Sequence, residues 1–479
     1  MPNASWKIEG GRILAREPVD MLIRNGIVVT LDRERRILKD GAIAVNESRI
    51  KDVGRTDQIA EKYRSDSIID AKGKVVLPGL IDTHGHYDNR FCGTLFYGEA
   101  HYLEAGVMGW RVLAPLSDAL DEEAAYRAAL IMFLSQIRSG TTCYGEMGAA
   151  RPDAVGKAAE EIGIRCYLSR STADEIGGLF SHMKRTDTEQ ALRENEAFVK
   201  RWNGAADGRI KASLGPHSAI NCSQELLMGI REMANEFNVG IQIHVGMGSG
   251  EVHFVVGKYG KRPVEFLHDI GLLGPDVGAV HAVILSPKDV RMLVEHDVRI
   301  SHNPYACLCE HHGIPNIPSY IAQGLSVALG SDSLITDVFY LMNLTAAVQN
   351  GYWGRWAQNP YIITSEEILE MATINGARFC QWENEIGSIE MGKKADLILV
   401  DSNKPHLIPS WDIVTELTTR ALGSDVDTVI IDGKIVMENR EVRTVNEGEV
   451  LEKARELARE VQPKAELLKK SPLNRWKVL

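Results

Sequence analysis

One stretch near the N-terminal end decides the fold class of this chain, and it runs Val75-Val76-Leu77-Pro78-Gly79-Leu80-Ile81-Asp82-Thr83-His84-Gly85-His86. Its apolar run with β-branched residues predicts a buried strand. His84 and His86 lie two positions apart at the end of that run, and such side chains leave a strand on the same face. Both imidazoles can therefore approach one metal ion, and neutral imidazole suits zinc and other first-row transition metals.

Further apolar strands downstream also end in a histidine or an aspartate. These terminal residues are His217, His244, His281, His302 and Asp332. A single one of these histidines would fit a surface or hydrogen-bonded position. Together they indicate a site in which three imidazoles and one carboxylate hold an ion. An open position on that ion would hold a water whose pKa the metal lowers.

Between these strand ends the sequence alternates apolar strands with amphipathic helices. A predicted helix over 122–138 precedes a strand over 140–144, and a helix over 153–162 precedes a strand over 164–168. This alternation is typical of a (β/α)8 barrel, in which the site lies at the C-terminal ends of the strands. We therefore predict an α/β fold whose catalytic barrel spans residues 78–389.

The two ends of the chain are both rich in short strands with tight turns. Asn25-Gly26 and Asp432-Gly433 are turn dipeptides of the kind that joins paired strands. We predict that residues 1–77 and 390–445 form one accessory β-sandwich domain. The charged segment 446–479 is predicted to be a C-terminal helical tail exposed to solvent.

Composition limits the partners and the compartment. The chain has 479 residues and a net charge of -11, without a basic stripe, which argues against nucleic acid and anionic membranes. Its seven cysteines form no Cys-x-x-Cys pair, which disfavours a disulfide framework and fits a reducing compartment. No apolar run is long enough for a membrane helix of about 18 residues. We expect a cytoplasmic homo-oligomer, a dimer or higher, that acts on a small molecule.

On these motifs the chain resembles the amidohydrolase superfamily, specifically its cytosine-deaminase-like branch. That branch holds the triazine hydrolases, guanine deaminase and the adenosylhomocysteine deaminases. The resemblance covers nearly the whole chain. Besides residues 78–86, matching segments are Ser139-Gly140-Thr141-Thr142, Gly215-Pro216-His217, Val280-His281-Ala282, Ser301-His302-Asn303-Pro304 and Leu329-Gly330-Ser331-Asp332.

The resemblance implies one divalent transition-metal ion per chain, with zinc favoured over cobalt, iron or manganese. The implied ligands are His84, His86, His244 and Asp332. No lysine stands where the two-metal members carry their carbamylated bridge, so a single ion is expected.

The resemblance also implies roles around the ion. His281 would polarise the substrate or transfer protons, with Asp332 as the second catalytic group. Substrate-binding positions are expected at His217, Trp110, Met247 and His311. Barrel packing explains Trp110 equally well, and a loop histidine explains His311. A role for His302 beside the site and a structural hydrogen bond both stay open.

One departure from the family concerns the proton-transferring acid. In the deaminases, a glutamate lies three residues after the metal-binding histidine that corresponds to His244. In this chain that position is Met247. A thioether cannot transfer protons. Glu251 is expected to be a glutamate on the exposed surface of a helix. The alternative is that Glu251 takes the place of the missing acid through a rearranged glycine-rich loop.

The missing acid favours a substrate whose reacting carbon is already a carbonyl. We predict a hydrolase of a C–N or C–S bond in an apolar or aryl urea, carbamate or amide, similar to the phenylurea and molinate (thiocarbamate) hydrolases. Attack by a metal-bound hydroxide would pass its proton through Asp332 to the leaving amine, with His281 supporting the oxyanion.

Two alternatives to this carbonyl hydrolase stay open. The first is an aminohydrolase or dehalogenase of an aromatic N-heterocycle such as a triazine, pterin, purine or pyrimidine. The second is a non-catalytic scaffold, which the retention of all the implied ligands disfavours.

Overall fold

A computed structural model describes residues 7–9, 12–14, 16–92, 120–175, 186–309, 312–332 and 335–468. Its centre is an eight-stranded parallel sheet in which every strand pairs with the next one along the chain. The strands are β10 (Leu80–Gly85), β11 (Thr141–Ala149), β12 (Arg165–Thr172), β13 (Ile210–Pro216), β14 (Gly240–Val245), β15 (Val277–His281), β16 (Arg299–His302) and β17 (Ser326–Leu329).

The barrel closes between its first and last strands. Gly85 forms a parallel bridge with Asp332, and the Asp332 N–H donates to the His84 carbonyl at 2.8 Å. The predicted (β/α)8 fold class is therefore confirmed.

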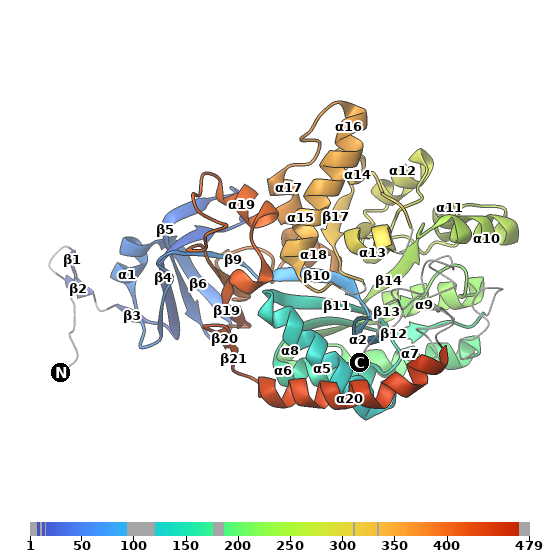
Figure 1. Ribbon diagram of the computed structural model, residues 1–479, viewed down its shortest axis with the longest axis horizontal. Helices are drawn as coiled ribbons and strands as arrows, with labels where there is room; N and C mark the ends of the chain where they lie inside the picture. The colour runs from blue at the N-terminus through green and yellow to red at the C-terminus, as the bar shows by residue number, and fades with distance from the viewer. Residues whose placement is uncertain are drawn as a thin grey trace, which may run out of the picture.

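Helices connect the strands and cover the outside of the barrel (Figure 1). They include α5 (Glu122–Arg138), α6 (Pro152–Ile162), α7 (Thr188–Trp202), α9 (Gln224–Phe237), α10 (Ser249–Tyr259), α11 (Pro263–Asp269), α12 (Pro287–Glu295), α14 (Ile317–Ala322), α15 (Val338–Val348), α17 (Ser365–Met371) and α18 (Ile374–Phe379). Several begin at a side chain that accepts a backbone N–H of the first turn, as Asp121 does for α5 and Ser223 for α9. Such caps satisfy amides that have no partner inside the helix.

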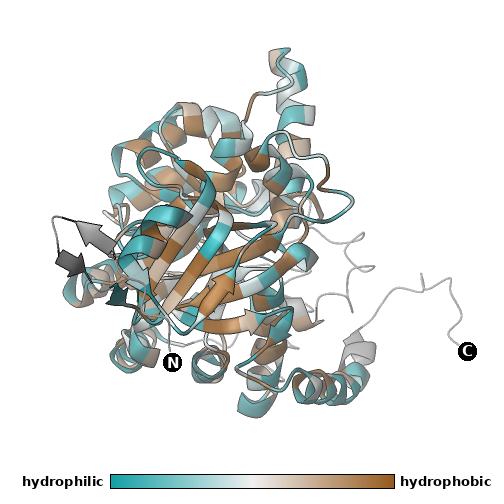
Figure 2. Cartoon of the chain, turned by 90° about the vertical axis from the view of Figure 1, so that its left-hand side faces the viewer, coloured by the Kyte–Doolittle hydropathy of each residue, from teal (hydrophilic) through white to brown (hydrophobic). Residues whose placement is uncertain are grey.

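Strands from both ends of the chain form a second sheet of nine strands, ordered β21-β20-β19-β18-β9-β4-β5-β6 with β8 beside β4. Their bounds are β4 (Met21–Val29), β5 (Ile37–Asn46), β6 (Arg49–Arg55), β8 (Ile68–Asp70), β9 (Lys74–Pro78), β18 (Leu397–Asp401), β19 (Val426–Ile431), β20 (Lys434–Glu438) and β21 (Glu441–Val442). Ile43 and Leu397, from opposite ends of the chain, share one apolar cluster. Figure 2 views this sheet from its own side of the molecule and shows its strands as largely hydrophobic.

The two sheets are joined by an almost continuous strand. β9 of the accessory sheet passes through Gly79 directly into β10 of the barrel. A Cβ at Gly79 would lie 2.0 Å from Thr142 Oγ1, so only glycine fits at this crossing. On the accessory side, β9 pairs antiparallel with β18 from the C-terminal part of the chain.

A buried cluster of ion pairs also joins the barrel to the accessory sheet. The Arg165 guanidinium, 1 % exposed, donates to both carboxylate oxygens of Asp396, at 2.8 and 2.9 Å. Asp432 lies 3.6 Å from the same guanidinium and pairs with Lys394 at 2.8 Å. Bidentate geometry of this kind sets orientation as well as binding free energy.

The C-terminal helix α20 (Glu447–Leu468) lies along α5, as Figure 1 shows. One face is buried, with Val450, Leu457 and Val461 in the main core, and Glu447 pairs with Arg138 at 2.6 Å. The prediction of a solvent-exposed tail is therefore wrong for this face, because the helix is amphipathic and its apolar positions find a partner. No helix among the described residues has the length and hydrophobicity needed to cross a membrane.

Leu457→Ala is expected to loosen α20 from the barrel. Removing a fully buried leucine side chain costs about 2–5 kcal/mol of stability. We expect a lower Tm and faster limited proteolysis within α20. Glu456→Ala is the matched control, because that neighbouring side chain is exposed. Equal proteolysis rates for the two variants would contradict the packing role of this face.

Candidate metal centre

Five side chains converge at the C-terminal ends of the barrel strands. They form two overlapping donor sets, His84 with His244 and His281, and His84 with His86 and Asp332. In each set the ligand atoms lie within 4.8 Å of one another. Asp332 Oδ1 lies 3.3 Å from His84 Nε2 and 3.6 Å from His86 Nε2.

The donor set fits a divalent transition metal. Both ring nitrogens of His84 are buried and neither makes a hydrogen bond of good geometry, the nearest polar atom to Nε2 being Asp332 Oδ1 at 3.3 Å. A buried polar group without a partner costs free energy, so this imidazole is built to bind something. Imidazoles with one carboxylate are the donor chemistry of catalytic zinc sites.

Protonation states favour the same conclusion. Burial lowers the pKa of His84, His244 and His281, so these imidazoles are neutral and keep lone pairs for a metal. Burial alone would raise the pKa of Asp332, but the surrounding imidazoles, His84 foremost, hold it below its ordinary value. The site thus holds one carboxylate charge among neutral rings.

Backbone geometry aims these groups. The Nδ1–H of His244 donates to the His217 carbonyl at 2.9 Å, which leaves Nε2 free to face the site. His281 and Asp332 both have a left-handed backbone, with φ of 73° and 61°. That conformation is costly outside glycine and concentrates at functional sites.

Asp82 lies beneath the histidine cluster in the barrel and connects two of its segments, a role that the sequence alone did not reveal. Its carboxylate accepts from the Ser331 N–H at 2.8 Å and from Gln136 Nε2 at 2.7 Å. Burial raises the pKa of Asp82 to about 6. The carboxylate therefore ties the strand that carries His84 to the segment that carries Asp332. Its place inside an apolar strand was the available signal.

Glu251 is not the surface residue that the sequence predicts. It is 3 % exposed because the first turn of α10 faces the loop after β14. Its Oε2 accepts from the Met247 N–H at 2.7 Å, while Oε1 is buried without a partner. Burial raises the pKa of Glu251 to about 7. A carboxyl group with a pKa near neutrality thus contacts the residue that replaces the deaminase acid.

Of the remaining predicted residues, some lie near the histidine cluster and others do not. His217 lies beside the centre, with its ring centroid 4.5 Å from that of His244, and Met247 is half-buried. His302 is buried but belongs to neither donor set. Trp110 and His311 lie outside the described residues.

From the sequence, the pair His311-His312 is expected either at the mouth of the pocket or as an ordinary pair of loop histidines, and the His312 ring lies 5.0 Å from that of His281. This places a second imidazole beside the predicted catalytic histidine.

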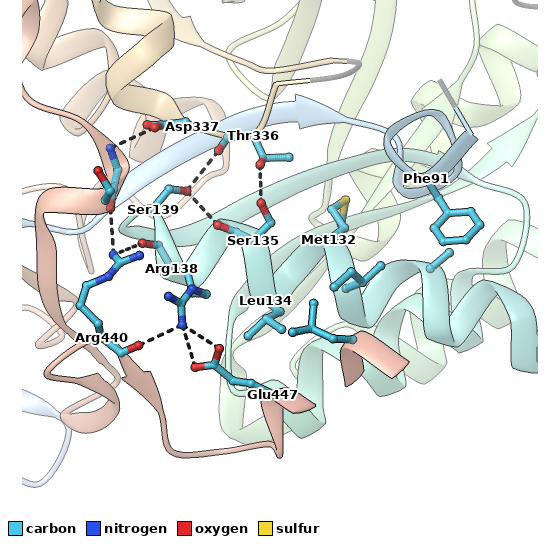
Figure 3. A pocket seen from close by; sticks show the side chains of 15 residues that line it. Phe91, Met132, Leu134, Ser135, Arg138, Ser139, Thr336, Asp337, Arg440 and Glu447 are labelled. Atoms are coloured by element: carbon cyan, nitrogen blue, oxygen red, sulfur yellow. Dashed lines mark hydrogen bonds and ion pairs between the residues drawn. The ribbon is translucent and has the colours of Figure 1, made fainter. Parts of the chain in front are cut away.

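A separate cavity of about 640 Å³ lies between α5, α20 and the 3-10 turn η6 (Gly423–Asp425), as Figure 3 shows. None of the five converging residues lines it. Its polar groups bond to one another, as Arg138 does to Glu447 and Asp337 to the Gly423 N–H. The chemistry therefore belongs at the histidine cluster and not in this cavity.

Known proteins resemble this chain in sequence and in fold. A family model described as "Amidohydrolase family" matches residues 75–436. A 5'-deoxyadenosine deaminase of Methanosarcina acetivorans is 36% identical over 450 residues, which are 93% of this chain and 99% of that protein.

Among solved structures, an adenosine deaminase of Xanthomonas campestris with bound zinc has a TM-score of 0.85 at 23% identity, covering 94% of this chain and 100% of that one. An atrazine chlorohydrolase of Arthrobacter aurescens with zinc has a TM-score of 0.78 at 21% identity, covering 91% and 99%. At these identities the two structures share the fold with this chain.

Proposed function

Because the chain belongs to the amidohydrolase family of metal-dependent hydrolases, we propose that it is an aminohydrolase that releases ammonia from an adenine-type nucleoside. The observation that carries this proposal is the buried Glu251, whose carboxyl group holds the Met247 N–H and has a pKa of about 7. It supplies the acid that is missing at position 247. The relative named a 5'-deoxyadenosine deaminase supports the substrate class.

We further propose that one zinc ion is held by His84, His86, His244 and Asp332, the imidazole and carboxylate donors that converge in the structure. When bound, the ion would act as a Lewis acid and lower the pKa of its water. Zinc is favoured because related folds were solved with it.

The chain's own residues then divide the proton transfers. In this hydrolysis one proton of water ends on a ring nitrogen and the other on the departing ammonia. Glu251 carries the first proton, because a pKa of about 7 leaves both of its forms populated near neutral pH. Asp332, ionised in the resting site, accepts the second proton and passes it to the amino group.

A carbonyl hydrolase of ureas or carbamates is the second candidate, favoured by Met247 at the position of the deaminase acid. A substrate panel separates the two. Zinc-reconstituted protein is incubated with 5'-deoxyadenosine and adenosine, and with a phenylurea and a thiocarbamate. Ammonia from the nucleosides supports the proposal, and release of an aniline or secondary amine supports the second candidate. Zinc-loaded protein without either activity would overturn both and favour a scaffold.

His281→Asn is expected to keep the metal and to lose about 10²–10³-fold in kcat. The metal stays because the four proposed ligands remain, although His281 also belongs to one donor set. Metal analysis and steady-state kinetics on the same preparation check this expectation. Loss of the ion would show that His281 is a ligand.

Assembly and location remain proposals as well. We propose a homo-oligomer that acts in the cytoplasm on a small molecule, without nucleic-acid or membrane partners. Analytical ultracentrifugation of the full chain tests the oligomeric state, and a purely monomeric protein would contradict it.

A further inference from the structure

A buried row of polar groups leads from the last barrel strand to His281. Thr83 Oγ1 lies 2.7 Å from the Leu329 carbonyl and 2.7 Å from Ser301 Oγ. Ser301 Oγ lies 3.0 Å from Asn303 Oδ1, and Asn303 Nδ2 lies 3.1 Å from His281 Nδ1. Thr83, Ser301 and Asn303 are 0 % exposed and His281 is 2 % exposed. Bulk water therefore supplies no proton to this row.

Counting protons gives the row a direction. A carbonyl oxygen only accepts, so the single Thr83 hydroxyl proton must go to Leu329. The contact between Thr83 and Ser301 then needs the Ser301 proton. Ser301 has no second proton for Asn303, so its remaining contact must be one in which Asn303 donates.

This direction determines the orientation of the Asn303 amide. With Oδ1 toward Ser301, two oxygens without a proton between them would face each other at 3.0 Å. The amide nitrogen and oxygen have nearly the same shape, so hydrogen bonding decides which way they point. With the NH₂ group toward Ser301, the amide oxygen faces His281 Nδ1 and requires a proton there.

We infer that the row Thr83–Ser301–Asn303 holds His281 in the tautomer with its proton on Nδ1 and a lone pair on Nε2. A neutral imidazole has only one ring proton, so the two nitrogens take opposite roles. The row requires the Nδ1 proton from its contacts alone, and Nε2 lies on the side of the donor set with His84 and His244. Thr83, Ser301 and Asn303 are thus positioning residues.

Space for the row is provided by Gly330. A Cβ there would lie 2.3 Å from Asn303 Oδ1 and 2.6 Å from Ser301 Oγ. A buried polar network is stable only when every member is satisfied, and glycine at this position allows the close contacts that satisfy it.

The tautomer assigns His281 the role of an acceptor in the resting site. Its Nε2 lies 3.8 Å from Asp332 Oδ2 and faces the converging donors. With a lone pair there, His281 first takes a proton or binds an ion, and only afterwards can it donate to a leaving group. This consequence for catalysis rests on the proposed function, whereas the tautomer does not.

The test is NMR of ¹⁵N-histidine-labelled full-length protein, with and without zinc. Two-bond ¹H–¹⁵N correlations distinguish protonated from bare ring nitrogens, and His281→Asn assigns the His281 signals by their loss. We expect a protonated Nδ1 in both states. A protonated Nε2 with a bare Nδ1 would overturn the inference, whatever the enzyme's substrate proves to be.

Thr83→Val tests whether the row Thr83–Ser301–Asn303 determines which ring nitrogen of His281 carries the proton. Without the Thr83 hydroxyl, Ser301 can donate to Asn303, so the amide reverses and the His281 proton moves to Nε2. We expect that reversal, with unchanged metal content and a kcat about 10–100-fold lower. A folded variant whose His281 keeps its proton on Nδ1 would overturn the causal role.

Thr141→Val is the matched control, because the buried Thr141 hydroxyl has no hydrogen-bond partner. It should leave the His281 signals unchanged. Should Thr83→Val fail to fold, Ser301→Ala asks the same question, since it removes the acceptor of the Asn303 NH₂ group. A mixture of tautomers is then expected, and a pure Nδ1–H form would count against the row.

Discussion

His244→Ala abolishes metal binding and hydrolysis together if the histidine cluster is the metal centre. The His217 carbonyl holds Nδ1 of this ring and directs Nε2 toward the other donors. The alanine variant lacks this nitrogen, so β14 no longer provides a donor atom to the site. A Lewis-acid ion supplies several kcal/mol of transition-state stabilisation. Because about 1.4 kcal/mol is a factor of ten in rate, we expect at least about a 10³-fold loss.

Metal content by mass spectrometry and turnover are measured on the same reconstituted sample. His253→Ala is the matched control, because His253 lies on the exposed side of α10 and belongs to neither donor set. It should retain about one ion per chain. A His244→Ala protein that keeps its ion and its activity would place the metal elsewhere.

Glu251→Gln has the second largest expected effect. Glutamine keeps the shape and can still accept from the Met247 N–H, but it carries no transferable proton. General acid–base catalysis contributes about 10²–10⁴-fold, so kcat should fall by that amount with zinc content unchanged. The wild-type rate should also fall as the pH drops through about 7, because Glu251 must be ionised to take up the first proton.

Two further variants sharpen this test. Glu265→Gln changes a glutamate that caps the neighbouring helix α11 in a similar way, bonding the Arg262 N–H at 3.0 Å, and should affect turnover little. Met247→Glu in the Glu251→Gln background puts an acid at the position that the deaminases use, and should restore part of the rate. A mild effect of Glu251→Gln would instead favour the carbonyl hydrolase.

The barrel and the convergence of its histidines and aspartate were predictable from sequence because both depend on local rules. Alternating strands and helices indicate a parallel barrel, and parallel strands bring their C-terminal ends to one edge. A histidine or aspartate at the end of β10, β14, β15 or β17 must therefore lie near the others. The backbone pattern alone places His84, His244, His281 and Asp332 together.

The groups missed by the sequence depend on orientations that local rules leave undetermined. Helical periodicity places Glu251 on α10 but does not say that the first turn faces the barrel. The Asn303 amide gains its role only through contacts with Ser301 and His281. Leu457 looks like an ordinary position of a charged helix until α5 is placed beside it.

The passage of β9 into β10 through Gly79 bears on how the protein is made. A ribosome delivers the His84 and His86 segment long before it delivers Leu397–Asp401, the strand that pairs with β9. Until then the nascent chain presents an apolar strand with an open edge, which invites aggregation. The segment of His84 and His86 gains its contacts with Asp332 once β17 has been made, and β9 gains its antiparallel partner later still, with β18. The proposed metal ion is therefore expected to bind after the chain is complete, and not while it is being synthesised.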